Sequence, residues 1–517
     1  MRFAFFVPQV HFLADADCRI RPIRLPCGFS EPNISPLRTV DSMFTILRSP
    51  LIFLSCVVLC VGCNGGKDSS DGKPKLQTAP LAITVVDDVD LAERIKLEIS
   101  ARLEETIEVE NVKREIFWNQ ERPARDIVIY PPAMMGELIQ RDWIVPVPSA
   151  TLASEEVAQD DIVQAIRQKE IRWGDKTYAL PLGSPVLMLM VRTDLMKQFN
   201  LEIPTTWQEY ATAVETIHGS DLLKSSETLG AATIEPLEAA YLPNLFLARS
   251  AAYVKHNDNL STYFDYTDGK ARLSSPGFVR AAEELTSIAK TIPGEFSTLS
   301  PQASAQAFLA GKSVMAIGWL NSSTLVPDTV SPDIAFAPIP GSAEIYQTQG
   351  NTWVPRQGPP VSVALLSTSG MVGSVSKVSG QTVHAAEVLA TLTGTELAAL
   401  ISPASRRTTL YRTSSLSMAD AWLPKGLPGG ALRQYASVST KQLQSTETLS
   451  SLRIAQRKQY EEALSETLRK LMTSESPNAE AALKEVSEAW DAISEKKGMA
   501  QHTDAFRRSQ GSGATPF

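Results

Sequence analysis

Short apolar runs alternate with amphipathic helical patterns from Leu81 onward, and this alternation restricts the fold more than any other feature of the sequence. The run that begins at Ile83 predicts a first strand. Apolar side chains then recur every four residues, as they do on one face of a helix. Runs around Val109 and from Asp126 predict two further strands. Strands and helices in this alternation are typical of an α/β protein with a doubly wound sheet.

The middle and end of the chain carry clear helix signals. Thr206 and Glu209 have the spacing of a capping box, and Ser275 followed by Pro276 suits a helix start. The tryptophans Trp207 and Trp490 lie on the apolar faces of predicted helices, which indicates packing. Further strands are predicted at residues 313–319, 333–340 and 361–367, and helices follow from residue 460 to residue 493.

All the cysteines precede residue 64, so nothing in the body can form a disulfide or a thiolate metal site. The apolar run at residues 51–61 follows Arg48, ends at Gly62-Cys63 and is too short to span a bilayer comfortably. We interpret residues 1–62 as an export signal whose true start lies near Met43. Gly62-Cys63 resembles a bacterial lipobox, which implies lipidation of Cys63, although Cys60 stands where that motif usually has leucine. An ordinary cleaved signal or a short membrane anchor is the alternative.

Two polar segments flank the body. Residues 63–80 are rich in Gly, Ser, Lys and Asp and lack a periodic apolar pattern, so we expect a tether that spans about 20 to 25 Å. Residues 501–517 are similarly polar, and we expect a flexible tail there.

Composition excludes several classes of protein. With 517 residues and 43% hydrophobic residues the chain is too long for one ordinary domain and has enough apolar material for a large core. Its formal charge of −8 argues against nucleic-acid binding. We expect no cofactor and no metal, because the sequence has no Walker loop, no Gly-x-Gly-x-x-Gly after a strand and no paired histidine spacing. Ser374 and Lys377 have the Ser-x-x-Lys spacing of penicillin-recognising enzymes, but the companion Lys-Thr-Gly is absent, and we expect no enzyme.

Several segments resemble, in order, the family 1 bacterial extracellular solute-binding proteins of ABC transporters. Residues 173–210 carry Gly-Asp-Lys-Thr-Tyr-Ala-Leu-Pro, an apolar strand, a short helix and Pro-Thr-Thr-Trp-Gln-Glu. The segments AFLAGKSVMAIGW at 307–319, AFAPIPG at 335–341 and the stretch 372–401 also agree with that family. The closing helices agree as well, and the likeness covers roughly residues 81–495.

The resemblance implies a bilobed, type II periplasmic-binding-protein-like fold made of two doubly wound α/β lobes. We expect lobe 1 to comprise residues 81–185 and 361–410, and lobe 2 to comprise residues 186–360 and 411–500. Chain crossings between the lobes are expected near 182–186, 357–361 and 406–414. Hinges of this kind let ligand binding shift open and closed populations.

The resemblance also suggests ligand-binding residues at strand ends, where aromatic rings and polar groups suit sugars. Tyr130 and Trp319 match stacking positions, although Pro132, Ala133 and Met134 replace the polar residues that often follow the first. A strand-capping role for Tyr130 and an interdomain core role for Trp319 are the alternatives, and helix capping explains Asp88 as well as ligand binding does. The complete candidate set is Trp319, Tyr130, Trp118, Trp353, Asn321, Asp88, Arg406 and Tyr460.

We therefore expect a monomeric, periplasmic or otherwise extracytoplasmic binding protein, anchored to a membrane through lipid. It would capture a small solute, above all a carbohydrate, and present it to an ABC permease. The alternative from another class is a ligand sensor or scaffold lipoprotein that keeps the fold without transport. A glycoside hydrolase is a third option, but no carboxylate pair can be assigned from spacing.

Overall fold

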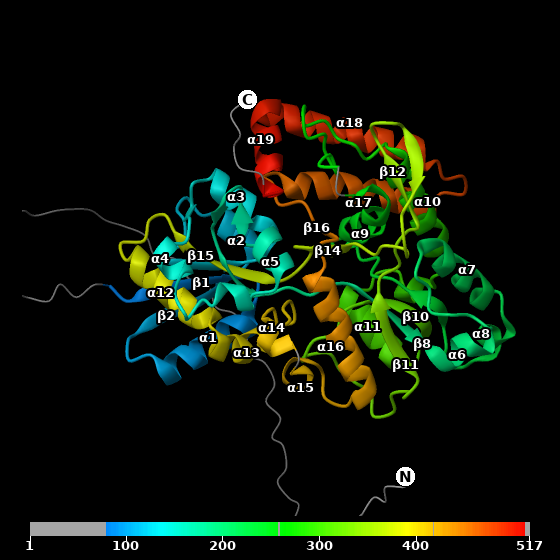
Figure 1. Ribbon diagram of the computed structural model, residues 1–517, viewed down its shortest axis with the longest axis horizontal. Helices are drawn as coiled ribbons and strands as arrows, with labels where there is room; N and C mark the ends of the chain where they lie inside the picture. Colours follow the sequence, from blue (N-terminus) through cyan, green and yellow to red (C-terminus); the bar gives the residue numbers. More distant parts are fainter. Residues whose placement is uncertain (1–78, 257–258, 417, 512–517) are drawn as a thin grey trace, which may run out of the picture. The chain divides into compact units, whose positions relative to one another are not determined.

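The computed structural model describes residues 79–256, 259–416 and 418–511, and these residues lie in one compact unit (Figure 1). The predicted export signal, Cys63 and most of the tether lie outside the described residues. Within the described chain two sheets form the centres of two lobes, as the resemblance implies. We use lobe 1 for the six-stranded sheet with its helices and lobe 2 for the four-stranded sheet with its helices. The exact lobe boundaries expected from the sequence stay predictions.

Lobe 1 is built on a sheet with the strand order β2-β1-β3-β15-β4, in which β7 also pairs with β15. The predicted early strands are β1, β2 and β3, which run parallel, whereas β15 returns antiparallel to β3. Their buried faces pack against helices from two distant parts of the sequence. The strands are β1 (Leu81–Val86), β2 (Ile107–Val112), β3 (Ile127–Tyr130), β4 (Ile144–Val145), β7 (Leu180–Gly183) and β15 (Met371–Ser376). The helices are α1 (Val89–Arg102), α2 (Arg114–Trp118), α3 (Met135–Gln140), α4 (Ser149–Leu152), α5 (Gln164–Lys169), α12 (Thr382–Thr393) and α13 (Thr395–Ile401), with a hairpin of β5 (Arg172–Trp173) and β6 (Lys176–Thr177).

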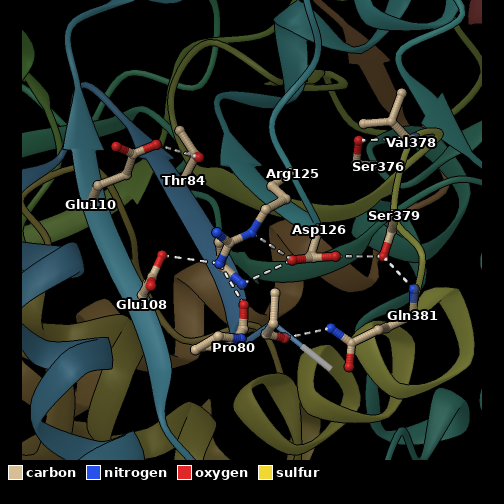
Figure 2. A network of polar contacts seen from close by, with 12 residues as sticks. Pro80, Thr84, Glu108, Glu110, Arg125, Asp126, Ser376, Val378, Ser379 and Gln381 are labelled. Atoms are coloured by element: carbon tan, nitrogen blue, oxygen red, sulfur yellow. Dashed lines mark hydrogen bonds and ion pairs between the residues drawn. The ribbon is translucent and has the colours of Figure 1, made fainter. Parts of the chain in front are cut away.

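A polar network fixes the edge of lobe 1 at which the body begins (Figure 2). The Asp126 carboxylate accepts hydrogen bonds from the Ala82 backbone at 3.0 Å and from the Ser379 hydroxyl at 2.7 Å. Arg125 lies between Asp126 and Glu108, with its guanidinium 3.0 Å from the Glu108 carboxylate. The network thus joins the beginnings of β1 and β3 to the segment that follows β15.

Lobe 2 contains a mixed sheet with the order β11-β8-β10-β9. Within this sheet β9 and β10 run parallel. Strand β8, which enters directly from lobe 1, pairs antiparallel with its neighbours β10 and β11. The strands are β8 (Met188–Arg192), β9 (Ala231–Ile234), β10 (Ser313–Gly318) and β11 (Ile334–Pro338), and a hairpin is formed by β12 (Glu344–Gln347) and β13 (Thr352–Pro355). The helices are α6 (Thr193–Gln198), α7 (Trp207–His218), α8 (Asp221–Ser225), α9 (Leu242–Val254), α10 (Pro276–Ala289), α11 (Pro301–Leu309) and α16 (Gly429–Gln444).

The C-terminal third passes repeatedly between the lobes. Short β14 pairs in parallel with β16, and α17 and α18 pack against α9 and α10 of lobe 2 (Figure 1). The remaining elements are β14 (Ala364–Leu366), α14 (Thr413–Leu416), α15 (Ala419–Trp422), β16 (Thr448–Ser450), α17 (Arg457–Thr473), α18 (Ala479–Lys497) and α19 (Met499–Ser509). Trp207 and Trp490 are buried, which confirms their predicted packing role.

The expectation of a flexible tail from residue 501 is wrong for residues 501–509. These residues belong to α19, whose Phe506 is buried beside Phe264 with ring centroids 5.4 Å apart. His502 also packs against Phe264, at 4.5 Å. The segment is polar in composition, but His502, Thr503, Phe506 and Ser509 are buried, and Phe506 and His502 complete the aromatic cluster around Phe264.

No single helix of the described chain is long and apolar enough to cross a membrane. The bent pair Thr382–Thr393 and Thr395–Ala404 passes that test of length and composition only when its two helices are taken together.

Candidate functional site

A cleft of about 1160 Å³ lies between the lobes. Lobe 1 contributes α2, α3 and the turn between β3 and α3, and lobe 2 contributes the start of α9 and one long face of α17. Its walls combine an aromatic ring, apolar surface and many charged groups. They include Arg114, Glu115, Trp118, Asn119, Ala133, Met134, Glu137 and Arg141 on one side, and Ala239, Ala240, Pro243, Gln456, Arg457, Lys458, Glu461, Glu462, Ser465, Glu466, Arg469 and Lys470 on the other.

The end of β1 positions the first cationic group of the cleft. Asp87 adopts a left-handed conformation with φ 60° and accepts a hydrogen bond from the Arg114 backbone at 2.8 Å. Its carboxylate also pairs with the Arg114 guanidinium at 3.0 Å. Burial lowers the pKa of Arg114, and Asp87 opposes that change. The arginine is therefore held at the start of α2 by the residue that ends the first strand.

Trp118 provides the aromatic surface of the cleft. The Arg141 guanidinium lies 4.8 Å from the Trp118 ring centroid and 5.1 Å from that of Trp143, and it pairs with Glu137 at 2.9 Å. Phe117 supports Trp118 from its own helix, with centroids 5.3 Å apart. An arginine held against an aromatic ring in this way offers hydrogen-bond donors beside an apolar face, which suits a ligand with both hydroxyls and C–H faces.

The wall formed by α17 consists of charged pairs one turn apart. Arg457 pairs with Glu461 at 2.8 Å, and Glu466 pairs with Lys470 at 2.7 Å. Burial raises the pKa of Glu461, and Arg457 opposes the rise. Arg114 interacts electrostatically with both Arg457 and Glu461 across the cleft. Paired charges present donors and acceptors with little net charge, an arrangement suited to a neutral polyhydroxy ligand.

Of the predicted ligand residues, Trp118 lines this cleft. Sequence reasoning missed the α17 face, although Arg457, Glu461, Glu466 and Lys470 were visible as i,i+4 pairs. Such pairs are usual on solvated helices, so their spacing alone does not indicate a binding wall.

Three other predicted residues, Asp88, Asn321 and Arg406, meet at residues 402–407, which we call the strap. The Asn321 amide donates to the carbonyl of Arg406 at 2.7 Å and to that of Ser405 at 3.3 Å. From lobe 1, the Asp88 carboxylate accepts a hydrogen bond from the Ser405 hydroxyl. Burial raises the pKa of Asp88, while the bond from Ser405 lowers it.

The strap therefore occupies polar groups at strand ends of both lobes. Asp88 is also the N-cap of α1, because its carboxylate accepts a hydrogen bond from the Leu91 backbone at 3.0 Å. This confirms helix capping, the alternative role given for Asp88 from the sequence. The Arg406 side chain is exposed and lies 3.5 Å from Asp90. Asp88 and Asn321 already have protein partners in this conformation.

The remaining aromatic candidates lie in packed surroundings. Tyr130 is fully buried, and its hydroxyl is 2.7 Å from that of Ser374 on β15. Tyr460 is fully buried too, 3.0 Å from the Ser494 hydroxyl. Trp319 is 4% exposed and packs edge-on against Tyr241. Trp353 lies on β13 between Tyr253 and Tyr346, in the β12–β13 hairpin of lobe 2. As ligand contacts these residues stay predictions.

Among residues 79–256, 259–416 and 418–511, no group of three His, Asp or Glu side chains is placed to hold a metal ion.

Comparison with known proteins identifies the fold. A model of the bacterial extracellular solute-binding proteins matches residues 119–366. An ABC-transporter solute-binding protein from Agrobacterium radiobacter K84 in complex with ribitol has a TM-score of 0.58 and 15% identity, over 80% of this chain and 98% of that one. A solute-binding protein from Agrobacterium vitis S4 with bound D-mannitol scores 0.56 at 16% identity, over 81% and 99%.

The sugar-binding protein MalE from Xanthomonas citri is a further structural relative. It scores 0.57 at 14% identity, over 81% of this chain and 98% of its own. No curated protein sequence matches the chain significantly. The chain has the bilobed α/β fold of the ABC-transporter solute-binding proteins, and residues 119–366 match the model of the bacterial extracellular solute-binding proteins.

Proposed function

We propose that this protein captures a small carbohydrate or polyol outside the cytoplasm and delivers it to an ABC importer. The observation that carries the proposal is the cleft between the lobes, in which Trp118 and Arg141 face the charged pairs of α17. Sugars present C–H faces ringed by hydroxyls, and this lining offers an aromatic surface with donors and acceptors on both sides. The ribitol and D-mannitol complexes of two proteins with this fold, and the sugar-binding protein MalE that shares it, support the same ligand class.

The proposal includes the predicted anchoring. An export signal before residue 63 and lipidation of Cys63 would hold the body at a membrane through the tether, within reach of a permease. Metabolic labelling with a palmitate analogue tests this step, and substitution of Cys63 by Ser should abolish the label. Labelling that persists in that variant would contradict lipidation of Cys63.

A thermal-shift screen tests the ligand class. Residues 64–517 contain the whole compact unit and are titrated with monosaccharides, oligosaccharides, polyols, amino acids and phosphate esters. A ligand at one hundred times its Kd adds about 2.7 kcal/mol to the stability of the folded state. We expect a shift for a sugar or polyol that Trp118→Ala abolishes.

Tyr346→Ala is the matched control, because Tyr346 packs in the β12–β13 hairpin and does not line the cleft. A shift that survives Trp118→Ala places the ligand elsewhere. The absence of any shift across the panel contradicts the carbohydrate proposal.

The strap favours a second candidate, a sensor or scaffold that keeps the fold without transport. Its contacts with Asp88 and Asn321 occupy strand-end groups of both lobes with the protein's own chain. A sensor would bind its ligand without a permease, so growth on the identified ligand should survive deletion of the gene. Loss of uptake in the deletion strain supports transport instead.

A further inference from the structure

A buried carboxylate joins two of the chain crossings between the lobes. Glu170, at the end of α5, is 1% exposed. Its Oε1 accepts a hydrogen bond from the Ser184 hydroxyl at 2.8 Å and another from the Ser367 backbone at 2.6 Å. Ser184 lies between β7 of lobe 1 and β8 of lobe 2, and Ser367 lies between β14 and β15. One oxygen atom thus binds both connections.

The third crossing packs against the same place. The Thr409 hydroxyl donates to the Ser184 carbonyl at 2.9 Å, and the Ser369 hydroxyl donates to the Arg407 carbonyl at 3.2 Å. Gly183 has φ 117°, and a Cβ there would lie 1.9 Å from the Thr409 carbonyl oxygen. The three connections are therefore in direct contact, and glycine at position 183 is what allows them to approach so closely.

Arg453 extends this cluster to the wall of the cleft. It is 1% exposed and precedes α17, and its guanidinium donates to the carbonyls of Glu170 at 3.0 Å and Arg172 at 2.8 Å. The segment that carries Glu170 therefore holds both the crossings and the beginning of the helix that lines the cleft.

We propose that Glu170 is a positioning residue that sets the equilibrium between open and closed lobes without contacting ligand. Lobe closure in a protein of this fold requires backbone rotation in the connections, and Glu170 restrains two of them through one acceptor atom. The inference concerns regulation of the cleft and rests on the proposed function only for its biological meaning. Its test uses no ligand, so it succeeds or fails independently of the carbohydrate proposal.

The test measures the distance between the lobes in ligand-free protein. Residues 64–517 contain no cysteine, so Asp160→Cys in lobe 1 and Asp221→Cys in lobe 2 give two unique spin-label sites. Both side chains are fully exposed. Pulsed electron paramagnetic resonance then gives the distribution of distances between the two spin labels for each variant.

Glu170→Gln and Glu170→Met separate the acceptor from the charge. Glutamine retains a carbonyl oxygen that can accept from Ser184 and Ser367, whereas methionine has a similar length and no oxygen. We expect Glu170→Gln to keep the wild-type distribution. Glu170→Met should change the ratio of its populations by about tenfold or more, the effect of losing two hydrogen bonds and leaving their buried donors without an acceptor. Unchanged distances in Glu170→Met, or equal changes in both variants, would overturn the proposal.

Ser184→Ala keeps the test decisive if Glu170→Met does not fold. This variant removes one donor to Glu170, and we expect a change in the same direction and of smaller size. Thr233→Val is the matched control, since it removes the buried hydroxyl that lies 2.6 Å from that of Tyr210 within lobe 2. Thr233→Val should lower the Tm and leave the distances unchanged. A wild-type distribution in Ser184→Ala, or the same change in Thr233→Val, contradicts the role of the crossings.

Discussion

At the scale of single residues, burial determines what a titratable group can do in this protein. His502 is 4% exposed and packs against Phe264 and Tyr460. Burial lowers the pKa of His502 to about 4, and a backbone contact with Gly269 only partly opposes this. An imidazole with such a pKa is uncharged at pH values near 7.

The lowered pKa of His502 predicts a pH dependence of stability. Unfolded histidine has a pKa of about 6.5, so between pH 6.5 and pH 4 the unfolded chain binds a proton that the folded chain does not. The contribution of His502 is therefore fully present above pH 6.5 and decreases as the pH falls towards 4. By pH 4.5 the loss of this contribution should lower the free energy of unfolding by roughly 2 to 3 kcal/mol.

Urea denaturation of wild type and His502→Phe at pH 7.5 and pH 4.5 measures this effect. Phenylalanine keeps an aromatic ring in the cluster and cannot be protonated, so the variant should lose less stability on acidification than the wild type does. Equal losses in the two proteins would show that another group carries the pH dependence.

Polar residues at strand ends were recognisable in the sequence, but their partners were not. Asp88 and Asn321 were predicted as ligand groups because they follow strands. In this conformation the Asp88 carboxylate accepts from Ser405, 317 residues later, and Asn321 binds carbonyls about 85 residues later. A local pattern contains no information about such a distant segment, so the strap could not be predicted.

At the scale of elements, local sequence signals were reliable where the side chains that form them hydrogen-bond to nearby backbone groups. The capping box predicted at Thr206 is present: the Thr206 hydroxyl accepts from the Glu209 backbone at 3.1 Å, and the Glu209 carboxylate accepts from the Thr206 backbone at 3.2 Å. By contrast, α19 was missed because three of its four buried residues, His502, Thr503 and Ser509, are polar, and only Phe506 is apolar. Periodicity over one short helix is too weak a signal against such a composition.

Thr206→Ala tests the contribution of the cap to α7. Removing the hydroxyl leaves the Glu209 backbone N–H without its partner, and we expect a loss of about 1 kcal/mol in unfolding free energy. Thr212→Ala makes the same change inside the same helix, where its hydroxyl donates to the Gln208 carbonyl. Since alanine is the better helix former, this control should be neutral or slightly stabilising. Chemical denaturation of both variants checks the difference, and equal losses would contradict a specific role for the cap.

At the scale of the whole molecule, the order of segments along the chain explains why the lobes were predictable and the cleft was not. Alternating strands and helices indicated an α/β fold, because each strand and its following helix are adjacent in sequence, and the resemblance to the solute-binding proteins implied that this fold has two lobes. The cleft instead joins α2 and α3 to α17, which is more than 300 residues further on. Only the fold brings these walls together.

The same topology makes a prediction about the strap. Arg406 and Arg407 are trypsin sites, and Asn321 and Asp88 hold the segment from opposite lobes. Asn321→Ala removes two hydrogen bonds to strap carbonyls, so local opening and cleavage after these arginines should become about tenfold faster. Asn478→Ala, which removes the N-cap of α18 far from the strap, is the control and should leave the rate of this cut unchanged.

The cut protein should remain one particle. Residues 408–517 include β16, which pairs with β14, and α16 and α17, which pack on β11 and α9. Many contacts between the two fragments therefore hold them together. The chain has already crossed between the lobes before residue 406, so the fragment before the cut includes parts of both lobes. We expect two bands on a denaturing gel and a single peak in size-exclusion chromatography. Fragments that separate under native conditions would mean that the last crossing, and not the packing of α16 and α17, holds the C-terminal third in place.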